Sequence, residues 1–230
     1  VTGVQTCALP IFTESEVKGI CEKKGVDFEQ MKFWYDGYSF DEVGSVYNPF
    51  SVMSSMRRKK YKSFWKKTSA ADSLVTYINM NYEGLKEDVI RLMTGEEIEV
   101  YTDDFQNDFQ NFASKDDVLT VLIHLGYLSY DWRENECYIP NREVAGEMVN
   151  AVKANNWKPV VDAIQQSKQL LQALRESDAA AVARGVEAAH DDNTSILSYN
   201  DENSLACVLS IAYYYAKNDY IIHRELPTGK

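Results

Sequence analysis

The stretch from residue 114 to residue 153 constrains the fold of this 230-residue chain more than any other. Ser114 and Asp117 have the spacing of a capping box, and apolar residues then recur at helical spacing as far as Gly126. YLSYDW alternates like a strand, RENE has the composition of a turn, and CYI fits a second strand that pairs back. Behind Pro140 and Asn141 the apolar residues return to helical spacing. The segment therefore predicts a helix, a hairpin and a second helix.

Helix, two-stranded wing and helix follow one another in a winged-helix-like order, and we place this module at about residues 114–153. Modules of this type read DNA when the helix that enters the groove carries a basic face. Here the helix predicted at about 115–125 begins with Lys115, Asp116 and Asp117, so its first turn is mainly acidic. This composition favours a structural role for the helix over DNA reading.

The rest of the chain predicts mostly helices. Thr13 and Glu16 form a second capping-box pattern, and Pro49 occupies the place of a first-turn proline. Helices are predicted at about 14–24, 28–34, 49–59, 70–80 and 84–94, twice between 158 and 190, and at 202–217, with a polar loop at 191–200 and short strands at 97–101 and 219–225. We therefore expect an α+β fold that is predominantly α-helical.

Composition and motif content exclude several classes of protein. The chain has 24 Lys and Arg against 35 Asp and Glu, so its net charge of -11 allows contact with a polyanion only through a local patch. No run approaches the roughly 18 apolar residues of a membrane span, so we expect a soluble, cytoplasmic protein with no membrane partner. Neither a P-loop, a Rossmann glycine pattern, a nucleophile elbow nor an H-E-x-x-H motif occurs. The four scattered cysteines indicate neither a zinc site nor a disulfide framework, and His124 is expected in the core.

One local patch stands out, the segment RRKKYKSFWKK at 57–67. Such a mixture of cations and aromatic rings can neutralise phosphates and stack bases. The candidate nucleic-acid-binding residues are Arg57, Arg58, Lys59, Lys60 and Lys62. A solvated helix end, with Tyr61, Phe64 and Trp65 tucked into the core, explains the same pattern equally well.

Neither end of the chain has the sequence expected of a natural domain boundary. Val1 to Ile11, VTGVQTCALPI, is uncharged and resembles the in-frame translation of a sequencing adapter, so we treat residues 1–11 as an adapter-derived artefact and expect the fold to begin at Phe12. At the other end HRELPTGK stops without an element that closes a domain. We therefore expect a piece of a longer protein.

Residues 198–230, SYNDENSLACVLSIAYYYAKNDYIIHRELPTGK, resemble the opening of the PD-(D/E)XK nuclease-like domain in a bacterial family that joins an AAA-ATPase-like domain to that nuclease fold. FWYDGYSF, VYNPFSV, FWKKTS, LIHLGYLSYD and YIPNREV resemble, in order, the C-terminal part of the ATPase-like region of the same family. The resemblance covers essentially Phe12 to Lys230. It implies that residues 12–155 end the ATPase-like region and that 156–230 hold linker helices and the first helix and strand of a truncated PD-(D/E)XK core.

The resemblance also implies site residues. In that family the nuclease-like core has a helix that carries a Glu, a strand, a second strand with a metal-binding Asp, and a third with E-x-K. Glu202 matches the helix Glu and would be a supporting catalytic carboxylate, and Glu225 at the end of the first strand would be a weaker neighbour. A carboxylate in the first helical turn also suits the helix dipole, which explains Glu202 without catalysis.

The remaining catalytic residues would lie outside this chain. The Asp and the E-x-K segment would follow Lys230, and the P-loop would precede Phe12. Phosphodiester hydrolysis needs several convergent groups to hold Mg²⁺ and activate water, so we expect this chain to be inert by itself. ATP and Mg²⁺ are expected as cofactors of the intact parent alone.

Three functions follow from this interpretation. The parent would couple ATP binding to metal-dependent cleavage of nucleic acid. Alternatively, it would be a regulatory adaptor that binds DNA or a protein partner through its winged-helix-like and helical modules without hydrolysis. A structural lid that transmits the nucleotide state between two domains is a further alternative. We expect the turn YDGYSF, with Tyr35, Asp36 and Tyr38, to hold such a lid to the ATPase-like core and not to contact the nucleotide directly.

Overall fold

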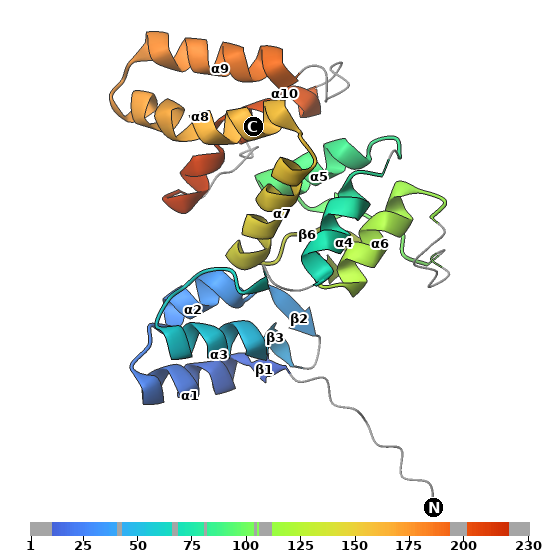
Figure 1. Cartoon of the computed structure of the whole chain (residues 1–230), viewed down its shortest axis with the longest axis vertical. Coiled ribbons are helices and arrows are strands. Elements are labelled where there is room, and N and C mark those ends of the chain that lie inside the picture. The colour runs from blue at the N-terminus through green and yellow to red at the C-terminus, as the bar shows by residue number, and fades with distance from the viewer. Residues whose placement is uncertain are drawn as a thin grey trace, which may run out of the picture.

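Three groups of elements follow one another along the molecule in the computed structural model (Figure 1). The structure describes residues 11–40, 43–65, 69–80, 82–103, 105, 112–193 and 202–220. The fold is α+β and predominantly helical, as the sequence predicts, with two three-stranded antiparallel sheets. Among the residues so described, no helix is long and apolar enough to cross a membrane.

The N-terminal group surrounds a small sheet. Its elements are β1 (Phe12–Thr13), α1 (Glu14–Lys24), α2 (Phe28–Tyr35), β2 (Tyr38–Phe40), β3 (Gly44–Tyr47) and α3 (Pro49–Arg58). The strands lie in the order β1-β3-β2, and Val46 pairs with both Thr13 and Tyr38. The predicted capping box is present, since Thr13 accepts from the Glu16 amide and Glu16 accepts from the Thr13 amide. The sequence indicated only a turn after α2 and missed this sheet, because strands of two to four residues carry little alternation.

The middle group contains the segment that most constrained the sequence. Its elements are α4 (Ser69–Ile78), α5 (Leu85–Thr94), β4 (Ile98–Glu99), α6 (Lys115–His124), β5 (Ser129–Asp131), β6 (Glu136–Tyr138) and α7 (Arg142–Ala154). The hairpin β5–β6 lies between α6 and α7, in the predicted order. β4 adds to it through the pair Ile98 and Cys137, so the hairpin belongs to a three-stranded sheet of order β4-β6-β5.

The C-terminal group is helical. It consists of α8 (Lys158–Arg175), α9 (Ala179–Asn193), α10 (Glu202–Ala212) and the 3₁₀ helix η2 (Tyr214–Asn218), and α8, α9 and α10 pack on one another. The α-helix predicted at 202–217 stops at Ala212, because the Tyr215 amide donates to Ser167 Oγ of α8 over 3.2 Å. α9 runs on to Asn193, into the predicted loop. Asp219 and Tyr220 are not in a strand, and the rest of the predicted strand 219–225 lies outside the described residues.

Two clusters of buried side chains form the core. The smaller one fills the N-terminal group around Val17, Met31 and Tyr35, and the larger one runs through the middle and C-terminal groups. The described cysteines Cys21, Cys137 and Cys207 are buried and unbridged, as expected. The prediction for His124 was wrong: it is exposed at the last position of α6, beyond the buried stretch 118–122, with its ring 5.7 Å from that of Phe105.

Candidate functional site

The basic segment begins on the last turn of α3 and continues into the loop that follows. Its five cations are all exposed, namely Arg57, Arg58, Lys59, Lys60 and Lys62. Lys59 caps α3 in the left-handed conformation, with φ of 49°. No acidic group in the described part of the chain forms an ion pair with any of these five cations. The segment is therefore a local concentration of positive charge on an acidic protein.

The aromatic residues of the segment face the protein. Phe64 is buried, and Trp65 packs edge-on against Tyr127 with ring centroids 5.2 Å apart. The Tyr61 hydroxyl donates to the Asp27 carbonyl over 3.1 Å. These rings anchor the loop to the protein, as expected if the aromatic residues pack into the core. The cations remain exposed to solvent.

Buried polar groups fix the backbone of the segment. The Tyr35 hydroxyl donates to the Lys62 carbonyl over 2.9 Å and accepts from the Lys62 amide over 3.2 Å. Glu143 of α7 accepts from the Phe64 amide over 2.6 Å. The cations of Arg58 and Lys62 lie 5.5 and 5.6 Å from the centroid of the Phe64 ring. The backbone of the segment is therefore fixed by hydrogen bonds at Lys62 and Phe64, and two of its five cations lie over the Phe64 ring.

A cleft of about 710 Å³ lies next to this segment. Figure 1 shows α2 below η2 (red), with α7 between the N-terminal and C-terminal groups, and the cleft is bounded by these elements and the ends of α5 and α8. The residues that line the cleft are Phe33, Trp34, Lys62, Ser63, Leu92, Met93, Gly95, Ile139, Asn141, Arg142, Ala145, Gly146, Glu147, Val149, Asn150, Ile164, Tyr214, Tyr215, Lys217 and Asn218. Three of them are cations, and Glu147 is the one acid in this set.

Arg142 is the first residue of α7 and forms one wall of the cleft. Its guanidinium carbon lies 5.4 Å from the ring centroid of Phe33 and 5.7 Å from that of Trp34. This stacking on α2 holds the guanidinium in place by a cation–π contact. No carboxylate among the described residues pairs with it.

Lys217 supplies the cation at the opposite wall. Its Nζ donates to the Met93 carbonyl over 2.8 Å and lies 5.5 Å from the Tyr214 ring centroid. Burial lowers the pKa of Lys217 to about 8, and the charge of Glu96 opposes that shift. The bond to Met93 occupies one of three ammonium donors and satisfies a carbonyl at the end of α5.

Two carboxylates point into the protein from successive turns of α7. Glu143 is 2% exposed and Glu147 is 4% exposed. Burial raises the pKa of Glu143 to about 7, against the hydrogen bond from the Phe64 amide that lowers it. Glu147 Oε1 has no hydrogen-bond partner among the described residues. In that same part of the chain no cluster of three or more potential metal ligands occurs.

The turn YDGYSF joins the N-terminal group to the middle group. The Tyr38 hydroxyl donates to the Gly126 carbonyl over 2.6 Å, and Gly37 lies against the Pro140 backbone before α7. Tyr35 is buried on the N-terminal side of the same junction. Tyr38 and Gly37 therefore make structural contacts that hold the N-terminal group against the middle group, whereas Asp36 accepts from the Ser45 hydroxyl over 3.4 Å within the N-terminal group.

The other predicted residues lie apart from the cleft. Lys115 at the start of α6 pairs with the buried Asp88 over 2.6 Å, so this charge is used inside the protein. Glu202 begins α10, as predicted, but its side chain lies outside the described residues. Glu225 is also outside them. Of the predicted site residues, Lys62 is the one that lines the cleft.

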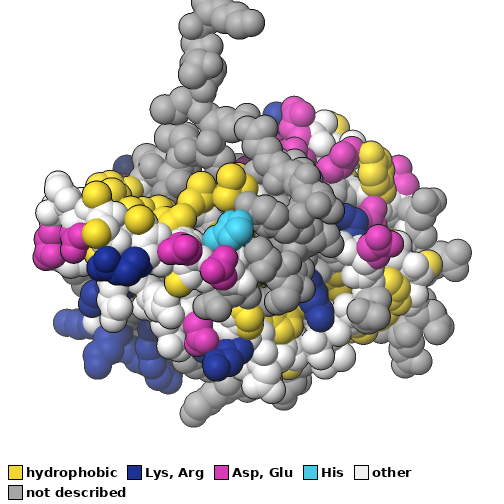
Figure 2. Space-filling view, turned by 90° about the horizontal axis from the view of Figure 1, so that it is seen from above, with side chains coloured by type: hydrophobic (Ala, Val, Ile, Leu, Met, Phe, Trp, Pro, Cys, Tyr) yellow, Lys and Arg dark blue, Asp and Glu magenta, His cyan; other side chains and the backbone are white. Residues whose placement is uncertain are grey.

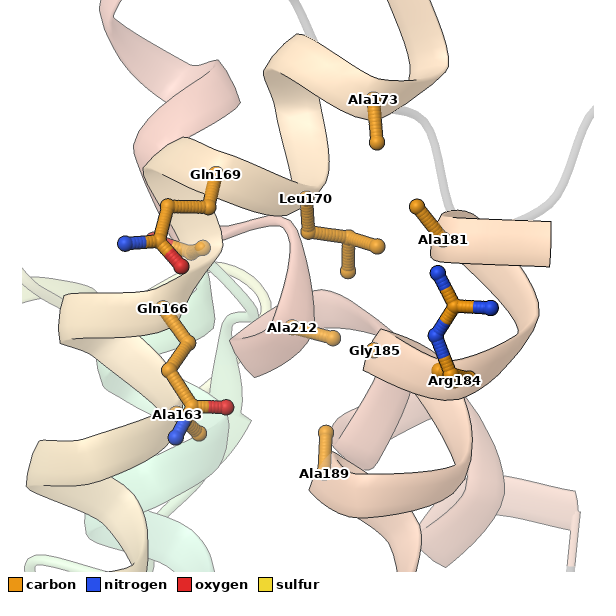
Figure 3. Close-up of a pocket in the computed structure, with 11 residues that line it drawn as sticks. Ala163, Gln166, Gln169, Leu170, Ala173, Ala181, Arg184, Gly185, Ala189 and Ala212 are labelled. Carbon is orange, nitrogen blue, oxygen red and sulfur yellow. The ribbon is translucent and has the colours of Figure 1, made fainter. Parts of the chain in front are cut away.

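A second hollow lies between α8 and α9. It has a volume of about 180 Å³, and Figure 3 shows mainly alanines facing one another across it. Leu170 reaches toward Gly185, where an added Cβ would lie 2.8 Å from its Cδ1. Gln166, Ser167, Gln169 and Arg184 complete the lining. Small side chains explain this hollow as a gap in helix packing.

Sequence reasoning missed Arg142 and Lys217 as members of a common site. Each had a local explanation, one at the start of a helix and the other near the end of one. They line one cleft only because α7 and η2 meet there. No motif spacing could have linked two positions so far apart in the chain.

Comparison with known proteins shows a short similarity to one curated protein. A protein described as "Uncharacterized protein in vnfD 5'region" from Azotobacter chroococcum mcd 1 is 30% identical over 70 residues. The match covers 30% of this chain and 13% of that relative, whose description names no activity. No family model matches the chain, and no solved structure matches it.

Proposed function

We propose that this chain is a binding and positioning region of a larger ATP-binding, nuclease-like protein, and that it contacts nucleic acid through the basic segment. The observation that carries the proposal is the group of five exposed cations, Arg57, Arg58, Lys59, Lys60 and Lys62, on a chain of net charge -11. Seen from above, Lys and Arg side chains gather at one edge of the molecule (dark blue, lower left), whereas acidic side chains are scattered over the visible face (Figure 2).

The geometry of the segment favours a contact with phosphates. Tyr35 and Glu143 hold its backbone at Lys62 and Phe64, so less backbone entropy is lost there when the cations meet a partner. Each phosphate that a cation neutralises releases condensed counterions, which gives affinity without sequence preference. The acidic remainder of the chain would restrict such binding to this patch.

The activity of the parent rests on the resemblance alone. In the intact protein, ATP would bind upstream of Phe12, and Mg²⁺ would be held by acids that follow Lys230. Glu202 would support that metal site or position water, with Glu225 beside it. Contact at the basic segment would then present a nucleic acid strand to the nuclease-like domain.

The alternative is a regulatory adaptor that binds a protein partner. Its support is on the outer face of α3, where Phe50 is 60% exposed and Met53 is 47% exposed, one turn apart. Arg57 follows one turn later, and Phe, Met and Arg are enriched in protein interfaces. The substitution Phe50→Ser would lower the affinity for a protein partner and leave DNA binding unchanged.

Salt dependence tests the proposed contact. We expect the double variant Arg57→Gln and Arg58→Gln to bind labelled duplex DNA more weakly, with the slope of log affinity against log salt reduced by about 1.8, because two phosphate contacts are lost. Fluorescence anisotropy over a range of salt concentrations measures this slope.

The matched control removes two cations elsewhere. Lys153 at the end of α7 and Lys158 at the start of α8 are both exposed and lie outside the cleft and the basic segment. The double variant Lys153→Gln and Lys158→Gln should keep the original slope. Equal slopes for the two double variants would show that the basic segment has no special role in DNA binding.

A further inference from the structure

We infer that the cleft between α2, α7 and η2 binds an unpaired stretch of nucleic acid that continues from the basic segment. This inference rests on the proposed function and adds the form of the nucleic acid. Lys62 belongs to both regions: it is a member of the basic segment and lines the cleft. Arg58 and Lys62 both lie over the Phe64 ring, so a cation of α3 lies near the lysine that lines the cleft.

The charges inside the cleft favour an anion. Lys62, Arg142 and Lys217 face a single lining acid, Glu147. No ion pair within the described part of the chain neutralises these three cations. In a partly desolvated cleft the attraction between a cation and a phosphate is screened less than at an open surface. A phosphate chain entering from Lys62 would therefore meet further cations on both walls.

Flat groups beside these cations favour unpaired bases. Phe33 is 48% exposed at the rim, and Trp34 and Tyr214 are half-buried in the walls. The Arg142 guanidinium already lies over Phe33 and Trp34, and a guanidinium plane is itself a surface on which a base can stack. Cations that track a backbone next to stacking surfaces are the arrangement found in proteins that bind single strands.

The size of the cleft selects against a duplex. Its volume of about 710 Å³ is within the range of roughly 300–1,000 Å³ for small-molecule sites. Such a space admits one or two unstacked nucleotides. A base-paired helix would reach only the outer cations, so the cleft should contribute to the binding of single strands alone.

The experiment compares two probes on the full chain. Fluorescein-labelled oligothymidine of ten nucleotides and a labelled duplex of ten base pairs are titrated by fluorescence anisotropy. We expect Phe33→Ala, at a half-exposed ring, to weaken binding of the single strand by about fivefold or more and to leave the duplex unchanged. Arg142→Gln should act in the same direction, and Lys153→Gln is the matched control on the same helix.

The outcomes separate this inference from the proposed function. Loss of single-strand affinity in both cleft variants, with circular dichroism unchanged, supports the inference. No loss, or an equal loss for both probes, overturns it. If neither probe responds to the double variant at Arg57 and Arg58, the proposed function itself fails.

Discussion

Gly37 stands where the N-terminal group meets the start of α7. Its φ of 110° is in a backbone region that residues with a side chain rarely adopt. An added Cβ would lie 1.8 Å from the Pro140 carbonyl oxygen. The partner is backbone, so it cannot move aside as a flexible side chain would. A single missing methyl group therefore allows two groups of elements to dock.

We expect Gly37→Ala to lower the free energy of unfolding by about 3 kcal/mol or more, because it adds both backbone strain and overpacking. Urea denaturation followed by circular dichroism measures the loss. Gly19 inside α1 is the control, since an added Cβ there meets nothing within 4 Å. Gly19→Ala should stabilise the protein by roughly 0.5–1 kcal/mol. Similar effects at the two glycines would contradict the close approach at Pro140.

At the scale of elements, α6 shows how a short helix is fixed at its start. Ser114 accepts from the Asp117 amide over 3.3 Å, and Asp117 accepts in return from the amides of Ser114 and Ala113. Lys115 then joins this first turn to the buried Asp88 of α5. The capping box sets where α6 begins, and the ion pair sets where that end lies.

Ser114→Ala should cost about 1 kcal/mol of stability, because the Asp117 amide loses its acceptor. Ser114→Gly should lower the free energy of unfolding by only a few tenths of a kcal/mol, since glycine suits the cap position and lets water reach the amide. Thermal or urea unfolding of both variants gives the comparison. The cap would have no role if alanine and glycine were equally harmless.

At the scale of the whole molecule, the three groups are joined by buried or partly buried hydrogen bonds. Tyr38 of β2 bonds to Gly126, Phe64 of the basic segment bonds to Glu143 of α7, and Lys217 of η2 bonds to Met93 of α5. Each contact links elements distant in sequence. The basic segment and the cleft therefore depend on how the groups dock.

Glu143 makes this docking sensitive to pH. Burial raises the pKa of its carboxyl from 4.5 to about 7 in the folded protein. The folded state binds more protons than the unfolded state between these values, so the free energy of unfolding falls as pH rises through this window. Glu143→Gln keeps an acceptor for the Phe64 amide and cannot ionise. The difference in the free energy of unfolding between the variant and the original protein should therefore grow by about 2–3 kcal/mol, in favour of the variant, as the pH rises from 5 to 8.

Urea unfolding at several pH values measures the difference between the two proteins. Glu134→Gln, at an exposed position of the turn between β5 and β6, is the control and should follow the original protein at every pH. Parallel stability curves for Glu143→Gln and the original protein would mean that Glu143 does not change its protonation on unfolding in this range.

The local signals in the sequence were sufficient for most helices. The capping residues Thr13 and Ser114 marked two helix starts, and Pro49 marked a third, because the groups that satisfy a helix end lie within a few residues of it. The same locality limited the prediction of strands. Neither β1 with β3 nor β4 with β6 could be paired from the sequence, since the partners lie far apart along the chain.

The sequence by itself determined the predominance of helices, the β5–β6 hairpin and the concentration of cations at 57–62, because each depends on neighbouring residues. Only the tertiary structure decided that Lys62, Arg142 and Lys217 line one cleft and that Glu143 is buried beneath the basic segment. Burial and electrostatic surroundings are properties of a packed arrangement. They arise when elements distant in sequence, here α2, α7 and η2, come together around one cleft, and no run of adjacent residues predicts that arrangement.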